Sequence, residues 1–392
     1  MSGPQHNRPI GFFVHHQGRG HIRRAEAILA HLGDRPITIM TADPDAISTI
    51  ADDRVQIIAL PNAIGDPSLS PALHDQTTPD VFHCVPLGSE RLRENAGLIA
   101  RFFADANPSL FFVDVSAEWV LYARLASVPA VKVRMHGARD DPGHAGAYQA
   151  AVAMVAPFHE DLEQADYPKW ARAKTFYSGG LCTTTKPVRS KEAARARLGL
   201  DLTQPVVVAM AGGGGAGTPL APLTMAARAW PEAHWFTIGP VSREGHETEF
   251  ANLTELGWVD DPLLWLAAAD VVIASAGDNT VHEIARVGRP FLCIPEWRYF
   301  DEQVAKAREL DRLGAAHANL TWPASPMQWR DAIGHARGID LDQQRRLFDP
   351  DAAAAIASFL ERLEQRLWST PQSATPSVSR AEPTPAALAQ PT

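Results

Sequence analysis

Short apolar runs alternate with amphipathic stretches along most of the 392-residue chain. The runs are rich in β-branched and aromatic residues, which is typical of buried strands. They cover Ile10–His15, Ile37–Met40, Val55–Ala59, Leu110–Val113, Ala130–Val133, Pro205–Met210, Trp235–Ile238, Val271–Ala274 and Phe291–Ile294. Between them apolar residues recur at helical spacing, as at Ile22, Ala25 and Leu29. Such alternation predicts an α/β fold with parallel sheets that carry helices on both faces.

The alternation restarts near residue 205, after a stretch of turn formers and polar residues at Ser178–Arg189. We expect the linker between two domains there, with a first domain at residues 1–180 and a second at 190–368. Residues 369–392 are mainly Pro, Ala, Ser and Thr, so we expect a disordered tail. Two Rossmann-like, doubly wound lobes would leave a cleft between the carboxyl ends of their strands, where ligands bind.

Composition narrows the class of protein. Apolar residues make up 45% of the chain, enough for two cores, and the net charge of −9 argues against nucleic-acid binding. Cys84, Cys182 and Cys293 form no C-x-x-C pair, which argues against a disulfide framework and a thiolate metal site. The polar N-terminus does not resemble a signal peptide, and no apolar stretch is long enough to cross a bilayer. We expect a cytoplasmic protein, and peripheral membrane contact stays open.

A glycine-rich turn, Gly18-Arg19-Gly20, joins the first strand to a helix whose first turn contains His21. The positive end of the helix dipole disfavours a protonated imidazole, and a general base must be neutral. A helix cap or a phosphate donor explains His21 equally well. Asp114 follows the strand Leu110–Val113. It either caps the next helix or faces His21 across neighbouring strand ends and orients the imidazole.

The strand at 205–210 leads into a glycine-rich loop in the second lobe. Gly212, Gly214 and Gly217 match the dinucleotide pattern G-x-G-x-x-G, but the next strand ends in Gly239 instead of the acid that binds a nicotinamide ribose. No lysine follows the loop, so it is not a Walker loop either. We expect its backbone to approach a diphosphate or an acceptor at Gly212, Gly213 and Gly214.

A second candidate phosphate site follows the strand Val271–Ala274. Gly277 allows a close turn, and the helix behind it offers unpaired N–H groups and a positive dipole end, which suit a diphosphate. Thr280 and Glu283 have the spacing of a capping box, which is one interpretation. In the other, the Glu283 carboxylate accepts hydrogen bonds from two ribose hydroxyls.

The run GDNTVHEIARVGRP at residues 277–290 and the run DEQVAKARELDRLGAA at 301–316 resemble the donor-binding motif of family 28 glycosyltransferases. That family includes the lipid-linked N-acetylglucosaminyltransferase of peptidoglycan synthesis and the plant galactolipid synthases. Both runs also resemble the UDP-glycosyltransferases of secondary metabolism. The segment GRGHIRR at 18–24 resembles the acceptor-side loop of these enzymes. The resemblance implies the GT-B architecture and an inverting transfer of a hexose from a UDP-sugar.

The resemblance also implies a role for each matching residue. His21 would be the base, with Asp114 as its acid partner, and the acceptor-side loop would comprise Gly18, Arg19 and Gly20. The donor would be bound at the ribose by Glu283, at the diphosphate by Gly277, Asn279 and Thr280, at the base by Trp258 and Val259, and at the sugar by Glu302 and Gln303. The sequence departs from the family at Lys306, where an asparagine is frequent, and in the bulky run Trp297-Arg298-Tyr299.

We expect no metal and no cofactor, since Asp43-Pro44-Asp45, which fits the Asp-x-Asp spelling of a metal site, has the proline of a turn or a helix cap. The expected partners are a nucleotide-sugar donor and an acceptor that is a lipid, a glycan or a small molecule. Three other functions stay open. They are a nucleotide-sugar epimerase of the same fold, a non-catalytic sugar-nucleotide-binding subunit, and a dehydrogenase.

Overall fold

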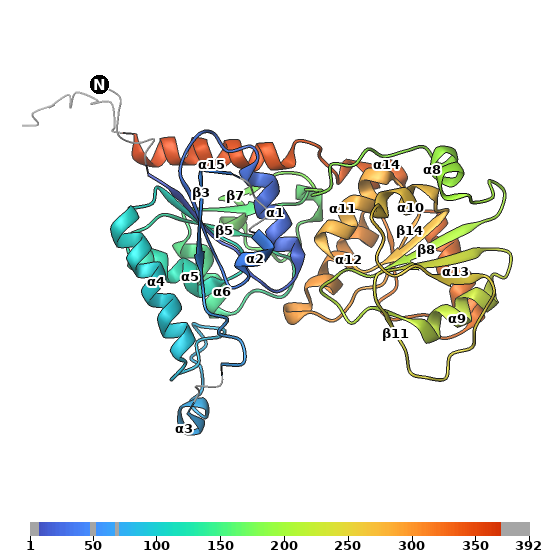
Figure 1. Ribbon diagram of the computed structural model, residues 1–392, viewed down its shortest axis with the longest axis horizontal. Helices are drawn as coiled ribbons and strands as arrows, with labels where there is room; N and C mark the ends of the chain where they lie inside the picture. Colours follow the sequence, from blue (N-terminus) through green and yellow to red (C-terminus); the bar gives the residue numbers. More distant parts are fainter. Residues whose placement is uncertain (1–7, 48–51, 67–69, 370–392) are drawn as a thin grey trace, which may run out of the picture.

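Two sheets of parallel strands form the framework of the protein, one in each of two lobes that lie side by side (Figure 1). The computed structural model describes residues 8–47, 52–66 and 70–369. The predicted tail therefore lies outside the described residues except for Ser369. The predicted α/β fold with two doubly wound lobes is confirmed.

The first lobe has a seven-stranded sheet in the order β3-β2-β1-β4-β5-β6-β7. Its strands are β1 (Ile10–Phe13), β2 (Ile37–Thr41), β3 (Val55–Ala59), β4 (Leu110–Val113), β5 (Ala130–Val133), β6 (Ala153–Ala156) and β7 (Thr175–Tyr177). Its helices are α1 (Arg19–Leu29), α2 (Pro44–Ile47), α3 (Pro71–His74), α4 (Glu90–Ala106), α5 (Ala117–Leu125), α6 (Pro142–Ala150) and α7 (Lys169–Arg172). Phe12, Phe111 and Phe112 lie in the cores on the two faces of the sheet.

The second lobe has a six-stranded sheet in the order β12-β10-β8-β13-β14-β15. Its strands are β8 (Val206–Met210), β10 (His234–Ile238), β12 (Leu253–Glu255), β13 (Val271–Ala274), β14 (Phe291–Cys293) and β15 (His317–Ala318), and β9 (Thr218–Pro219) pairs separately with β11 (Val241–Ser242). Its helices are α8 (Lys191–Leu198), α9 (Leu220–Ala229), α10 (Pro262–Ala268), α11 (Asp278–Val287), α12 (Glu302–Arg312), α13 (Pro326–Arg337) and α14 (Leu341–Arg346). In each sheet the strand order reverses beside the first strand, between β1 and β4 in the first lobe and between β8 and β13 in the second. Ligands bind at such points in doubly wound folds.

The register of the central strands determines which residues meet at the carboxyl edge of the first sheet. β1 pairs in parallel with β4, and Phe13 lies opposite Val113. The backbone N–H of Asp114 donates to the Phe13 carbonyl at 3.0 Å. The loop after β1 and the residue after β4 therefore emerge side by side, as the sequence predicts for His21 and Asp114.

The last helix, α15 (Ala352–Trp368), returns to the first lobe and lies along it (Figure 1). Ile356, Leu360 and Leu363 recur at helical spacing and pack into the core that contains β1 and α1. The Trp368 indole donates to the Ser109 carbonyl at 2.9 Å. The predicted second domain, residues 190–368, therefore includes a helix that packs with the first lobe, since the apolar face of α15 completes the core of that lobe. No helix within the described residues has the length and hydropathy needed to cross a membrane.

Candidate active site

His21 lies in the first turn of α1 because of the backbone at Gly18. Gly18 is the N-cap of the helix and has a φ of 88°, a left-handed conformation that favours glycine. No side chain caps the helix. The cap interpretation of His21 is therefore wrong, and its imidazole is available for other contacts.

His21 and Asp114 contact each other directly. The Nδ1 atom of His21 lies 3.0 Å from Oδ2 of Asp114, whose side chain is buried. A carboxylate only accepts hydrogen bonds when ionised, so Nδ1 carries the proton and Nε2 carries the lone pair. This is the tautomer that a general base requires. The interpretation of Asp114 as a helix cap is also wrong, because the N-cap of α5 is Ser116.

Arg24 keeps Asp114 ionised. Burial raises the pKa of this carboxyl, but the Arg24 guanidinium and His21 outweigh burial and hold the pKa well below its usual range. The Nη2 atom of Arg24 lies 3.0 and 3.1 Å from the two carboxylate oxygens of Asp114. Asp114 is therefore a negative charge at neutral pH, able to stabilise a protonated imidazole.

The positive end of α11 lies in the second lobe without a side-chain cap. Gly277 is its N-cap and Asp278 is its first residue. Thr280 lies inside the first turn, so the capping-box interpretation of Thr280 and Glu283 is wrong. No hydrogen bond to the Glu283 carboxylate occurs among residues 8–47, 52–66 and 70–369, and burial raises its pKa to about 7. Glu283 is thus a partly buried carboxylate that can accept hydrogen bonds from a ligand.

The structure separates the two residues that the resemblance assigns to the donor sugar. The Oε1 atom of Gln303 accepts from the backbone N–H groups of Ala276 at 3.2 Å and Glu296 at 2.8 Å. Its amide N–H₂ group lies towards Gly277, 4.0 Å from where a Cβ atom would stand. Gln303 therefore holds the loops after β13 and β14 together and retains donors for a ligand. Glu302 instead forms an ion pair with Arg139 of the first lobe, 2.7 Å long.

The glycine-rich loop after β8 lies beside an exposed tryptophan. A Cβ atom on Gly213 would stand 3.6 Å from the Trp258 ring, and one on Gly212 would meet open space. The Trp258 side chain is 68% exposed. Val259 differs, since it packs against the core of the lobe and its side chain does not face outward. Of the two residues that the resemblance places at the base, only Trp258 offers a free ring face.

The facing edges of the two lobes touch at several points. Arg24 reaches Asp278 at 3.4 Å, and the backbone N–H of Ala138 donates to the Phe300 carbonyl at 2.7 Å. A Cβ atom on Gly20 would stand 3.4 Å from the Asn279 amide. The acceptor-side loop therefore lies against the start of α11, where the resemblance places the diphosphate.

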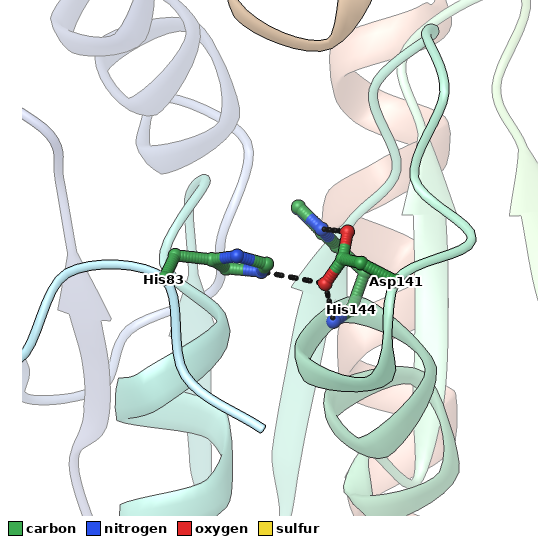
Figure 2. Close-up of side chains that lie close together, drawn as sticks. All are labelled: His83, Asp141 and His144. Carbon is green, nitrogen blue, oxygen red and sulfur yellow. Dashed lines mark hydrogen bonds and ion pairs between the residues drawn. The ribbon is translucent and has the colours of Figure 1, made fainter. Parts of the chain in front are cut away.

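A cluster of His83, Asp141 and His144 lies at the start of α6 (Figure 2). His144 donates from Nδ1 to Asp141 at 2.6 Å, and its Nε2 atom lies 3.0 Å from Arg139. Burial, Lys132 and Arg139 lower the pKa of His144 to about 3. A metal on Nδ1 would require a proton on Nε2, where Arg139 already donates. The cluster is therefore better suited to hold Arg139 in place than to bind a cation.

The sequence offered little warning of Arg24, Arg139 and Lys132. Lys132, at the end region of β5, is buried and donates to the Val115 carbonyl. Burial and, second to it, Arg139 lower the pKa of Lys132 to about 7. Val115 follows Asp114 with a φ of 76°, which is strained for a β-branched residue. The one sequence signal for this group was the three-residue spacing from His21 to Arg24, which places both on one helix face.

A known protein family matches part of the second lobe. Residues 238–337 match the Glycosyltransferase family 28 C-terminal domain. These residues, which lie in the second lobe, are therefore similar to the C-terminal domain of family 28. This segment contains Trp258, Gly277, Glu283 and Gln303, so the resemblance to family 28 inferred from the sequence is confirmed.

The curated relatives that this chain resembles are named as N-acetylglucosamine transferases. A UDP-N-acetylglucosamine–N-acetylmuramyl-(pentapeptide) pyrophosphoryl-undecaprenol N-acetylglucosamine transferase of Sorangium cellulosum is 37% identical over 102 residues, which are 26% of this chain and 24% of the relative. The transferase of that name from Thermus thermophilus is 29% identical over 197 residues, 45% of this chain and 53% of its own. The chain thus spans between about a quarter and half of the length of these relatives.

Solved structures support the fold of both lobes together. Acinetobacter baumannii MurG has a TM-score of 0.61 and 15% identity, and the match covers 91% of this chain and 99% of MurG. The spinosyn rhamnosyltransferase SpnG, complexed with thymidine diphosphate, has a TM-score of 0.57 and 19% identity over 91% of this chain and all of that one. The UDP-GlcNAc 2-epimerase of Neisseria meningitidis has a TM-score of 0.55 and 10% identity over 90% of this chain and all of that one. The segment that matches family 28 therefore lies in a two-lobed chain of GT-B fold.

Proposed function

We propose that the protein is a glycosyltransferase that moves a hexose from a UDP-sugar to an acceptor hydroxyl, with inversion and without a metal ion. The observation that carries this proposal is the His21–Asp114 pair, which lies across a contact between the lobes from the uncapped start of α11. A base on one side and a positive helix end on the other are the two elements that an in-line displacement needs.

The chemistry begins with the acceptor hydroxyl at His21. Nε2 removes the hydroxyl proton while the oxygen attacks the anomeric carbon from the face opposite the diphosphate. Asp114 stabilises the imidazolium that forms. The bond between the anomeric carbon and the diphosphate breaks, and the N–H groups at the start of α11 stabilise the negative charge on the departing UDP. An α-linked donor therefore gives a β-glycoside.

Donor recognition falls to the family 28 domain. Glu283 accepts the ribose hydroxyls, the exposed Trp258 ring packs on uracil, and the amide of Gln303 reaches the sugar. The choice of UDP follows the names of the curated relatives, which are UDP-N-acetylglucosamine transferases. Those names also describe a pyrophosphoryl-undecaprenol acceptor, and we leave the acceptor of this chain as a hydroxyl-bearing lipid, glycan or small molecule. The described cysteines Cys84, Cys182 and Cys293 are free thiols, which supports a reducing, cytoplasmic setting.

A panel of nucleotide sugars tests the proposal. The purified chain is incubated with each donor, with and without cell-extract acceptors, and free nucleotide is measured in the presence and absence of a chelator. The proposal expects release from a UDP-sugar that depends on acceptor and resists the chelator. Conversion of the donor without acceptor would instead indicate an epimerase, and binding without turnover would indicate a non-catalytic subunit. Activity that needs added magnesium or manganese would contradict the metal-free mechanism.

A further inference from the structure

Arg24 connects the catalytic pair to the donor lobe. It lies one helical turn after His21 on α1, and its side chain is buried. Its Nη2 atom contacts both carboxylate oxygens of Asp114 and lies 3.0 Å from Nδ1 of His21. Its Nη1 atom lies 3.4 Å from Asp278, the first residue of α11. One guanidinium thus touches the base, its acid partner and the start of the diphosphate helix.

Asp278 is itself placed for this contact. It occupies the first helical position but makes no cap hydrogen bond to the helix N–H groups. Its carboxylate pairs with Lys306 and with Arg24. Burial raises the pKa of Asp278, but Lys306 and Arg24 outweigh burial and keep it ionised. The N–H groups of α11 therefore stay available to a ligand, while the carboxylate faces the other lobe.

We propose that Arg24 is a positioning residue that holds Asp114 in place for His21 and couples this pair to the donor lobe through Asp278. The inference rests on the proposed function, since it gives the coupling a purpose. When the lobes are arranged as in this structure, the same contact that joins them also fixes the acid partner of the base. The position of the donor helix is then tied, through Arg24, to the position of the base and its acid partner.

The contacts of Arg24 and Asp114 also determine which tautomer His21 adopts and how readily it is protonated. Arginine has no acceptor, so Arg24 can donate to Nδ1 only if that nitrogen is unprotonated, and Nε2 would then be unable to act as a base. Asp114 prevents this by accepting from both groups. The charge of Arg24 opposes protonation of His21, and the charge of Asp114 favours it. When Arg24 is removed, its charge no longer opposes the protonation of His21, while the charge of Asp114 still favours it.

Other titrating groups around His21 act in known directions. His15 lies 5.7 Å away between ring centroids, and burial and then His21 lower its pKa to about 4, so it is neutral. Burial also lowers the pKa of His16, while Asp43 raises it. Arg24, Asp114 and the Asp278–Lys306 pair complete the set. Arg24 is the one permanent cation in this set in direct contact with the imidazole.

The experiment measures the His21 pKa by nuclear magnetic resonance of its ring nitrogens, together with the pH profile of kcat/KM and the Kd for UDP. We compare Arg24→Gln, Arg24→Lys and, as the matched control, Arg23→Gln. Arg23 is on the same helix but exposed, and it pairs only with Glu26 among its described contacts. In Arg24→Gln the His21 pKa should rise because the cation beside the imidazole is gone, and a rise of about one unit lowers the neutral fraction about tenfold at pH values well below the pKa. The acid limb of the profile should move with the His21 pKa, and UDP affinity should stay within about twofold. In Arg24→Lys the His21 pKa should lie closer to the wild-type value, because lysine keeps the positive charge.

A second variant tests the link between the lobes. Asp278→Ala with Lys306→Asn removes both charges of a buried pair, so that no charge is left unpaired. We expect a kcat reduced severalfold, about 3- to 10-fold, with a His21 pKa close to that of the wild type, because Arg24 still holds Asp114. A wild-type kcat in this double variant would overturn the coupling.

The outcomes separate this inference from the proposed function. An unshifted His21 pKa and pH profile in Arg24→Gln, in a wild type that turns over, would overturn the positioning role. A wild type without transferase activity would remove the proposed function, while the ring-nitrogen titration would still decide whether Arg24 positions the pair. If Arg24→Gln fails to fold, Arg24→Met keeps the apolar stem of the side chain and removes the charge, and a His21 pKa identical to wild type in that variant would also overturn the inference.

Discussion

The proposed catalytic groups of the first lobe already hold one another, whereas Glu283 and Trp258 of the second lobe have no such contacts within the described residues. Asp114 accepts hydrogen bonds from both His21 and Arg24. In the second lobe the Glu283 carboxylate lacks a hydrogen bond within the described residues, and the Trp258 ring is largely exposed. The difference shows where each lobe makes its contribution. Under the proposed function, the first lobe has its proton-transfer groups in place without a ligand, and the second lobe has groups left to contact one.

The largest difference between the two lobes should appear when the proposed base, His21, is replaced. His21→Ala should lower kcat by roughly 10²–10⁴-fold, the usual contribution of a general base, while the Kd for UDP stays nearly unchanged because the nucleotide binds the other lobe. His31→Ala is the matched control, since His31 is exposed just beyond the end of the same helix. Steady-state kinetics and calorimetry give the two constants. A near wild-type kcat with the true acceptor would move the base to His15, His16 or another residue.

Asp114→Asn should give the next largest loss, in kcat again. The amide keeps the shape of the side chain but not its charge, so Arg24 can donate to Nδ1 of His21 and favour the tautomer that cannot act as a base. The double variant His21→Ala/Asp114→Asn should be no slower than His21→Ala, because the acid works only through the histidine. Losses that multiply in the double variant would mean that Asp114 has a separate role.

Glu283→Gln should act on the other lobe and on binding. A charge-assisted hydrogen bond contributes roughly 1.5–3 kcal/mol, so UDP affinity should fall by about that amount with a near-normal melting temperature. The carboxyl pKa of about 7 adds a sign: wild-type affinity for a UDP-sugar should rise with pH through neutrality as Glu283 ionises. A UDP-sugar is the right probe because its diphosphate has no proton that titrates in this range. The variant should lose that dependence.

The control for this measurement is Glu232→Gln, an exposed residue before β10 at the opposite edge of the sheet. It should bind the UDP-sugar as the wild type does. An early melting temperature with normal binding in Glu283→Gln would mean that the carboxylate stabilises the fold instead of the ribose.

Trp258→Ala should give the smallest of these effects. Stacking of a base on an aromatic ring is worth roughly 1–3 kcal/mol, and an exposed ring has little packing to lose. Calorimetry should also rank UDP above GDP, ADP and TDP in the wild type. Trp170→Ala, an exposed tryptophan of the first lobe, is the matched control. Equal or tighter GDP binding would exclude the proposed base site.

The same comparison explains which parts of the site the sequence predicts. The pairing of His21 with Asp114 follows from strand order, because neighbouring parallel strands end at one edge. The start of α11 is less predictable: Thr280 and Glu283 have a capping spacing, yet the turn at Gly277 begins the helix three residues earlier. Local spacing does not determine where a strand-to-helix turn closes.

Contacts between the lobes were not predictable from local pattern. Arg139 meets Glu302 only because two segments far apart in the chain face each other. The fold shows the same limit, since the strands β6 and β7 are not among the predicted runs and α15 crosses back to the first lobe. Periodicity specifies which face of an element is apolar, but not which distant element covers it.

The most direct test of the mechanism is the configuration of the product. With an active UDP-α-hexose and its acceptor, proton nuclear magnetic resonance of the anomeric signal early in the reaction distinguishes the two anomers. A single displacement driven by the His21–Asp114 pair predicts a β-glycoside as the first product. An α-glycoside would require two displacements or a different course, and it would contradict the role assigned to His21.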